Sequence, residues 1–160
     1  MSLRTEPHLH QINISDGGVP KLPVPEARIT RHGVAGDRQR SPKIHGGPDR
    51  AVCLFSLEII KALQAEGHPI TPGSCGENLT LAGIEWSAIK PGDRLCVGAV
   101  QLEITSYTAP CEHNARWFRD RDCRRISQKK HPGWSRVYAR VLIEGMVKPG
   151  DPVSLESDLG

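Results

Sequence analysis

The sequence predicts a mainly β fold, a partly closed β-barrel that carries a few short helices. Three observations lead to this fold class. Sixteen glycines and thirteen prolines among 160 residues indicate many turns, several short segments alternate between apolar and polar residues, and only one segment has a clear helical period. A chain of this length most often forms one domain, so we expect a single domain over 1–160 with its core at about 10–155.

The first strands are expected on either side of a proline-rich connection. Residues 8–14 alternate around three apolar positions, which favours a strand. The prolines within 20–25 predict an extended edge connection, and residues 27–30 form a second short strand. Residues 31–48 are polar and rich in glycine without an apolar period, which is typical of a functional or a mobile loop.

The clearest helix follows a short apolar strand at 51–55. Ser56 can cap this helix, and the apolar residues of 57–63 recur at helical spacing. Gly67 closes the helix as a left-handed residue. Residues 73–81 then predict a turn that enters another strand.

The second half predicts antiparallel strands joined by tight turns. Residues 94–97 and 100–104 flank Gly98, and glycine at the first turn position suits a type II′ hairpin. A further strand at 134–143 places four apolar residues on one face, namely Val137, Ala139, Val141 and Ile143. The sequence Lys-Pro-Gly-Asp precedes two strands, which indicates similar tight entries into both.

Charge and cysteine content narrow the class of protein. The chain has 21 basic and 18 acidic residues, a balance that excludes a design dominated by nucleic-acid binding. No apolar run approaches the roughly 20 residues of a membrane helix, and the first residues form no apolar signal segment. The five cysteines include no C-x-x-C pair, so neither a structural zinc site nor a disulfide framework is expected. We therefore expect a reduced, cytoplasmic protein that binds neither nucleic acid nor membrane.

Cys111 is the sharpest candidate for chemistry. Pro110 ends the strand that begins near residue 100 and presents Cys111 at its tip, and His113 and three arginines follow. A cysteine near cations and a helix N-terminus is shifted toward thiolate, which is both a nucleophile and a soft metal ligand. The alternative is a buried structural thiol, and spacing alone leaves both readings open.

Two glycine-rich segments form a second candidate site. Residues 36–38 and 45–50 place two arginines and a histidine beside flexible backbone, and N–H groups with guanidinium forks bind phosphate. Asn78 can read the edge of a heterocycle, because its amide both donates and accepts. Trp134 beside Arg136 can flank a planar ligand. A solvated loop, a turn residue and a core tryptophan are the respective alternatives.

Six motifs occur in a fixed order along nearly the whole chain: Gly36-Asp37-Arg38-Gln39, residues 45–52, residues 76–80, Gly92-Asp93-Arg94-Leu95 with Gly98, Pro110-Cys111 and Gly150-Asp151. This order resembles the MOSC domain family, named for the C-terminal domain of molybdenum cofactor sulfurase. The resemblance is to small stand-alone bacterial members similar to 6-hydroxylaminopurine-resistance proteins. It implies a barrel like the β-barrel domain of pyruvate kinase. The chain departs from the common pattern at Cys75, where relatives often have an aromatic residue, and at Ala109, where they often have Arg or Gln.

The resemblance also implies a cofactor and the residues that hold it. The cofactor is molybdenum cofactor (molybdopterin), a pterin with a dithiolene and a phosphate. Cys111 would be the catalytic residue and the molybdenum ligand, or would carry sulfur. The expected cofactor-binding residues are Arg38, His45, Gly46, Gly47, Arg50 and Asn78.

Four functions are compatible with these residues. The first is an oxidoreductase that reduces small N-hydroxylated compounds, with electrons from a separate flavin or iron–sulfur protein. The second is a sulfur carrier or cofactor-handling protein that uses a Cys111 persulfide. The third is a cysteine hydrolase based on Cys111 and His113. The fourth is a phosphate-binding module that needs Arg38 and Arg50 but not the cysteine.

Overall fold

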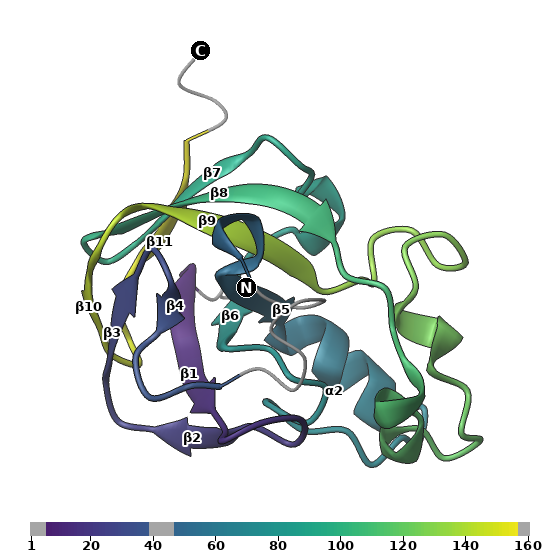
Figure 1. Ribbon diagram of the computed structural model, residues 1–160. Coiled ribbons are helices and arrows are strands. Elements are labelled where there is room, and N and C mark those ends of the chain that lie inside the picture. The colour runs from purple at the N-terminus through teal and green to yellow at the C-terminus, as the bar shows by residue number, and fades with distance from the viewer. Residues whose placement is uncertain (1–5, 39–46, 157–160) are drawn as a thin grey trace.

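The computed structural model describes residues 6–38 and 47–156, and these form a mainly β structure with a few short helices (Figure 1). The strands are β1 (His8–Ile14), β2 (Leu22–Val24), β3 (Ala27–Thr30), β4 (Gly33–Val34), β5 (Val52–Ser56), β6 (Leu79–Ala82), β7 (Arg94–Val97), β8 (Val100–Tyr107), β9 (Val137–Ile143), β10 (Gly145–Val147) and β11 (Val153–Leu155). The helices are α2 (Leu57–Ala65) and the 3₁₀ helices η1 (Pro48–Arg50), η2 (Trp86–Ala88), η3 (Glu112–Trp117) and η4 (Cys123–Ile126). In the described part of the chain, no helix is long and apolar enough to cross a membrane.

The strands form two sheets around one apolar core. The larger sheet has eight strands in the order β11-β7-β8-β9-β5-β6-β1-β2, and the smaller has three in the order β10-β3-β4. All paired neighbours are antiparallel except β5 and β6. A parallel pair needs a crossover connection, and α2 provides it because it lies between β5 and β6 in the chain.

The two halves of the large sheet approach each other without a continuous closing ladder. Near the start of β1, the Leu9 amide donates to the Asp151 carbonyl over 2.9 Å, and the Gly150 amide donates to the Leu9 carbonyl over 2.7 Å. His8 also forms an isolated bridge with Pro152. The expectation of a partly closed barrel is therefore met only in part, because the sheet order still ends at β2 and β11.

The helix predicted at 57–63 is confirmed with its cap. Ser56 adopts an extended backbone, and its side chain accepts a hydrogen bond from the Ile59 amide over 3.2 Å. The apolar stripe of α2 is buried at Leu57, Ile60 and Leu63. Gly67 has a φ of +95°, as expected for the left-handed residue that ends the helix.

The hairpin at Gly98 is also confirmed, but one residue of β9 is placed differently from the prediction. Val137, Ala139 and Val141 are buried, whereas Ile143 is 53% exposed. Leu102 of β8 pairs with Val141, but the preceding residue Gln101 pairs with Ile143, so Leu142 is an extra residue in β9. Such a bulge reverses the facing of the residues after it, and Ile143 therefore shares the outward face of Gln101.

The repeated Lys-Pro-Gly-Asp sequence forms two equivalent turns. In each, the aspartate side chain accepts a hydrogen bond from the lysine amide, over 3.1 Å at Asp93 and 3.0 Å at Asp151. Gly92 and Gly150 both have a φ of +96°, which favours glycine. The same local chemistry therefore makes the same entry into β7 and β11.

The turn that enters β6 is closely packed around Gly73 and Glu77. Gly73 has a φ of +88°, and a Cβ atom there would lie 2.3 Å from the Lys21 carbonyl oxygen. The Gly73 amide and the Thr80 hydroxyl donate to one Glu77 carboxyl oxygen over 3.0 and 2.9 Å. Glu77 is fully buried, and this burial raises the pKa of its carboxyl group.

We expect Gly73→Ala to destabilise the fold much more than Gly17→Ala. Both glycines have positive φ, but a Cβ at Gly17 meets nothing within 4 Å. The strained φ alone costs of order 1–3 kcal/mol, and displacing the Lys21 backbone adds a further penalty of about the same size. Urea unfolding measures both variants, and equal losses of unfolding free energy would contradict the close packing at Gly73.

We expect the unfolding free energy of Glu77→Gln, relative to that of the parent protein, to increase as pH rises. In the unfolded chain this glutamate ionises above its ordinary pKa of 4.5, whereas the folded protein keeps its proton to higher pH. The parent protein thus loses stability from this group as pH rises above about 4.5, and glutamine removes that loss. Urea unfolding of both proteins between pH 4.5 and 8 tests this, and a pH-independent difference would show that the Glu77 carboxyl is not perturbed.

Candidate functional site

A pocket opens where five separate parts of the chain meet. Its walls come from residues 18–21, from 75–78 before β6, from 108–114 after β8, and from both β5 and the segment 136–138 that enters β9. None of these segments is adjacent to another in the sequence, so the sheet order brings them together. Among the predicted residues, Cys111, His113 and Asn78 line this pocket.

Cys111 lies at the start of η3 rather than at the tip of a strand. Strand β8 ends at Tyr107, and Cys111 is the N-cap residue of η3. Its amide donates to the Asn114 side-chain oxygen over 3.1 Å, and the Asn114 amide donates back to the Cys111 carbonyl over 2.9 Å. These reciprocal bonds hold the half-buried Cys111 at the pocket wall.

Arg136 connects the two cysteine-bearing walls of the pocket. Its Nη1 donates to the Cys75 carbonyl over 2.6 Å, and its Nη2 donates to the Asn114 Oδ1 over 3.2 Å and to the Ala109 carbonyl over 3.4 Å. Asn114 also donates to the Cys75 carbonyl, over 3.3 Å. Arg136 and Asn114 thus fix the position of Cys111 relative to Cys75.

No described carboxylate forms an ion pair with Arg136, although the buried Glu77 carboxyl interacts with its charge electrostatically. The residue is only 6% exposed, and all its hydrogen-bond acceptors are neutral oxygens. Its Nε is buried with no hydrogen-bond partner in the described part of the chain, and no described carboxylate lies within ion-pair distance of the guanidinium. A buried cation is costly unless an anion accompanies it, so this pocket favours an anionic ligand.

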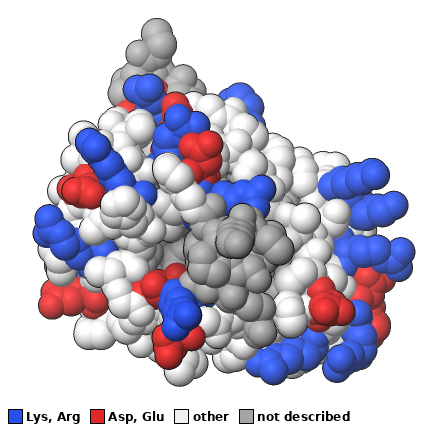
Figure 2. Space-filling view, viewed as in Figure 1, with Lys and Arg blue, Asp and Glu red and all other residues white. Residues whose placement is uncertain are grey.

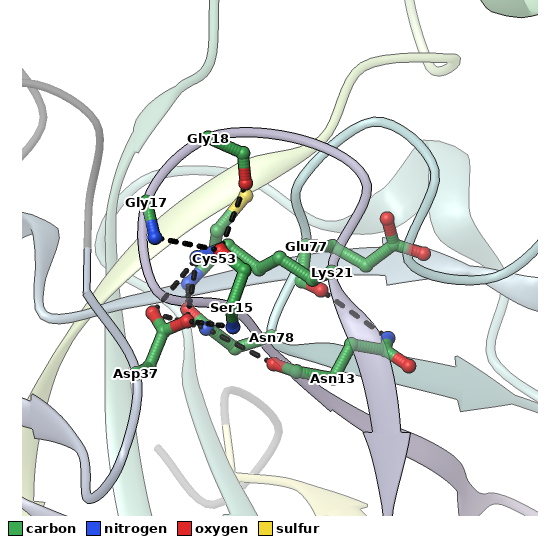
Figure 3. Close-up of polar contacts among 9 residues, drawn as sticks. All are labelled: Asn13, Ser15, Gly17, Gly18, Lys21, Asp37, Cys53, Glu77 and Asn78. Atoms are coloured by element: carbon green, nitrogen blue, oxygen red, sulfur yellow. Dashed lines mark hydrogen bonds and ion pairs between the residues drawn. The ribbon is translucent and has the colours of Figure 1, made fainter.

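Lys21 is a second buried cation in the pocket, and an ion pair with Asp37 neutralises its charge (Figure 3). Lys21 Nζ contacts the two Asp37 carboxylate oxygens at 2.7 and 2.8 Å, and the two side chains are 7% and 6% exposed. Asp37 also accepts from the Asn78 side chain over 2.9 Å and from the Ser15 amide over 2.9 Å. This ion pair joins the glycine-rich segment after β4 to the pocket.

Asn78 lines the pocket, but its amide is used within the protein. Its Nδ2 donates to Asp37, and its Oδ1 accepts from the Cys53 amide over 3.0 Å. Backbone bonds also join Asn78 to Cys53 and Asn13. Nδ2 also donates to the Asn13 carbonyl over 3.4 Å. Both amide hydrogens of Asn78 therefore have acceptors within the protein, and neither is left to donate to the predicted heterocycle edge.

The remaining thiols of the pocket are deeply buried. Burial raises the pKa of Cys53 to about 11, and it raises the pKa of Cys75 as well. Both groups are therefore neutral thiols at physiological pH. Burial also raises the pKa of the Tyr138 phenol, to about 12, so this wall residue is a neutral hydrogen-bond donor.

Three of the other predicted cofactor residues, Arg38, Gly47 and Arg50, are not part of the pocket wall. Arg38 is exposed, and its amide donates to the Ser15 carbonyl over 2.8 Å. Gly47 is exposed before η1, and the Arg50 guanidinium carbon lies 5.4 Å from the centre of the Tyr138 ring. His45 and Gly46 lie outside the described residues.

Trp134 has the structural role that was the alternative to ligand binding. It packs against the core, and the Arg125 guanidinium carbon lies 4.3 Å from the centre of its ring. It is not among the residues of the pocket wall. Its neighbour Arg136 is the functional candidate instead.

The outer surface beside the pocket is basic. The connection between β8 and β9 lies at one side of the molecule, and Lys and Arg side chains gather at that edge in the space-filling view (Figures 1 and 2). Residues 116–130 contain seven basic side chains and two aspartates. Two of the arginines form ion pairs, with Asp122 and Glu66. The edge of the pocket that carries η3 therefore continues into a positively charged surface.

Asn114 and Lys21 were missed as site residues by sequence analysis, and Arg136 was named only as a residue that can flank a planar ligand together with Trp134. Asn114 had a usable signal, because a polar residue three positions after a helix N-cap commonly bonds back to it. Arg136 had a weaker one, since a charged residue at the entry to an apolar strand needs a buried partner. Lys21 gave no signal, because its partner Asp37 is distant in the sequence.

Comparison with known proteins places the chain among proteins of one family. The model of the MOSC domain matches residues 41–154. The chain is 30% identical over 142 residues to the uncharacterized protein YflK of Bacillus subtilis, matching 88% of this chain and 63% of YflK. It is 28% identical over 137 residues to YiiM of Escherichia coli, matching 82% of this chain and 60% of YiiM. The chain thus spans slightly less than two thirds of the length of these relatives.

A solved structure has the same fold. The crystal structure of YiiM from Geobacillus stearothermophilus superimposes with a TM-score of 0.74 at 26% identity, over 93% of this chain and 74% of that one. The mainly β architecture with few helices agrees with it. The chain belongs to the MOSC domain family, which is associated with molybdenum cofactor binding.

Proposed function

We propose that this pocket binds molybdenum cofactor through Cys111 and that the protein uses it to reduce N-hydroxylated compounds. One observation carries the proposal: the Cys111 thiol and the Arg136 guanidinium, which has no ion-pair partner among the described residues, belong to the same pocket and are joined through Asn114. Membership of the MOSC family supports the choice of cofactor. The substrate class rests on the resemblance to 6-hydroxylaminopurine-resistance proteins.

The residues present suit an anionic cofactor that brings most of its own metal ligands. No group of three or more His, Cys, Asp or Glu side chains gathers as a metal site within the described residues. A dithiolene cofactor needs only one soft ligand from the protein, and Cys111 offers a thiol at the pocket wall. Arg136 Nε, which is buried and without a partner, is suited to the cofactor's negative charge. The pocket therefore fits the group.

The protein's own residues would position and balance this group. When bound, the cofactor supplies the two-electron redox chemistry. Asn114 and Arg136 hold the Cys111 segment, and Arg136 neutralises the anion. His113 lies in the same wall and is the side chain best suited to deliver a proton to a leaving hydroxyl group.

Electrons would come from a separate flavin or iron–sulfur protein, in the cytoplasm. We place its docking surface at the basic segment 116–130, because this segment adjoins the pocket edge formed by η3. An acidic partner surface would be attracted to it and oriented by it. The small-molecule substrate enters from the open side of the pocket.

The sulfur-carrier function is the second candidate, and the half-buried position of Cys111 at the pocket wall favours it equally. A Cys111 persulfide would be detected as cyanide-labile sulfur. The hydrolase function has less support, because no hydrogen bond joins Cys111 to His113 among the described contacts. A phosphate module based on Arg38 and Arg50 also has less support, since neither residue lines the pocket.

We expect Cys111→Ser to lose molybdenum while keeping its fold. Serine is nearly isosteric, but its hydroxyl is a much harder ligand. The matched control is Cys96→Ser. Cys96 lies in strand β7 outside the pocket, and its thiol donates to the Glu156 carboxylate. Both variants are made in a host that synthesises the cofactor. The molybdenum content of each protein and the fluorescence of its oxidised pterin are then measured. Equal molybdenum in Cys111→Ser and the parent would refute ligation by this thiol.

We expect Arg136→Met to weaken cofactor binding by at least about tenfold, since a charge-assisted bond contributes about 1.5–3 kcal/mol. Methionine keeps much of the length and apolar volume of the arginine stem. Arg140→Met is the control four residues further along, in β9, because Arg140 is exposed and pairs with Asp49 and Glu103. Titration with molybdopterin measures both variants. Parent-like affinity in Arg136→Met, with Arg140→Met unchanged, would remove Arg136 from the site.

A further inference from the structure

We propose that Cys111 and Cys123 form a redox-active pair, in which Cys123 closes a reversible disulfide onto Cys111 after a hydroperoxide has oxidised Cys111. The proposed function does not use Cys123. The pair is also independent of cofactor binding, because it depends only on the two thiols and the backbone that holds them. It assigns a modification site to the segment between β8 and β9.

The Cys123 thiol contacts the backbone of Cys111. Cys123 begins η4, and its Sγ lies 3.5 Å from the Cys111 carbonyl oxygen, to which it donates. Bridged cysteines have Cα atoms about 4.4–6.8 Å apart. The proposed bridge therefore requires rotation of the side chains and a local shift of η3 and η4 that brings the two sulfur atoms together.

Local hydrogen bonds keep both cysteines in this arrangement. Asn114 fixes the Cys111 segment through its side chain and its amide. Asp122 caps η4 by accepting from the Arg124 amide over 3.1 Å, which fixes the residue next to Cys123. Both cysteines are half-buried, so a small oxidant can reach them.

The other thiols are less suited to the same reaction. Cys53 and Cys75 are 6% and 1% exposed. Cys96 is half-buried, but it lies in strand β7 and its thiol donates a hydrogen bond to the Glu156 carboxylate. Among the described hydrogen bonds, Cys123 is the only cysteine whose side chain contacts Cys111, and this contact selects it as the resolving thiol.

The chemistry balances as a two-electron oxidation of two thiols. The Cys111 sulfur attacks hydrogen peroxide, an S–O bond forms, the O–O bond breaks and water leaves, which gives a sulfenic acid. Cys123 then attacks the Cys111 sulfur, an S–S bond forms, the S–O bond breaks, and the hydroxyl leaves as water with the thiol proton. A dithiol reductant restores both thiols. In the bridged state Cys111 cannot ligate a metal, and it is protected from irreversible oxidation.

The test uses the full-length protein without cofactor, fully reduced and then treated with hydrogen peroxide. Alkylation and peptide mapping should show a link between Cys111 and Cys123, with two of the five thiols lost and both restored by dithiothreitol. Cys96→Ala should form the same link. In Cys123→Ala, the Cys111 sulfenic acid should persist, so that dimedone labels it, and without dimedone it should be oxidised further to sulfinic acid. Circular dichroism checks that this variant is folded.

Two results would overturn the proposal. One is a disulfide between Cys111 and Cys75 in the parent protein. The other is sulfinic acid formation at Cys111 at the same rate in the parent and in Cys123→Ala, because a resolving thiol must compete with that step. Neither result bears on molybdenum retention, so failure of this pair and failure of the proposed function can be told apart.

Discussion

The buried guanidinium of Arg136 is the constraint on which the rest of the site depends. It enters the pocket from the start of β9 and bonds the Cys75 carbonyl, the Ala109 carbonyl and the Asn114 side chain. Through these bonds it reinforces the contact between two segments that are also joined by the Asn114 bond to the Cys75 carbonyl. Taking a guanidinium out of water costs several kcal/mol, and neutral acceptors return only part of that cost. An anionic ligand at the free Nε would complete the arrangement.

Another part of the pocket wall, at Lys21, has a different electrostatic character. There the charge of Lys21 is cancelled by Asp37 at contact distance, and Asp37 in turn fixes Asn78. A cancelled pair can set the shape of a pocket without selecting the charge of its ligand. The difference between the two walls is what gives this pocket a net preference for anions, and it places that preference beside Cys111 rather than at the exposed arginines of the glycine-rich loops.

The parts of the fold that local chemistry determines could be predicted from the sequence. The α2 helix needs only its cap and its apolar period, and the turn at Gly98 needs only a residue that tolerates positive φ. Ile143 could not be placed, because an extra residue in β9 depends on pairing with β8. In the site, Cys111 was identified from its neighbours in the sequence, and the family resemblance agreed. The role of Arg136 as the link between pocket segments was not predicted, because its partners come from positions far away in the chain, and only the folded sheet brings them together.

The most direct measurement of the account is the sulfur coordination of molybdenum in the cofactor-loaded protein, obtained by X-ray absorption at the molybdenum edge. The account predicts one sulfur ligand more than the pair that the dithiolene supplies, because the Cys111 thiol faces the same pocket as the Arg136 guanidinium. A spectrum with the dithiolene sulfurs alone, or protein from a cofactor-producing host that holds no molybdenum, would contradict it.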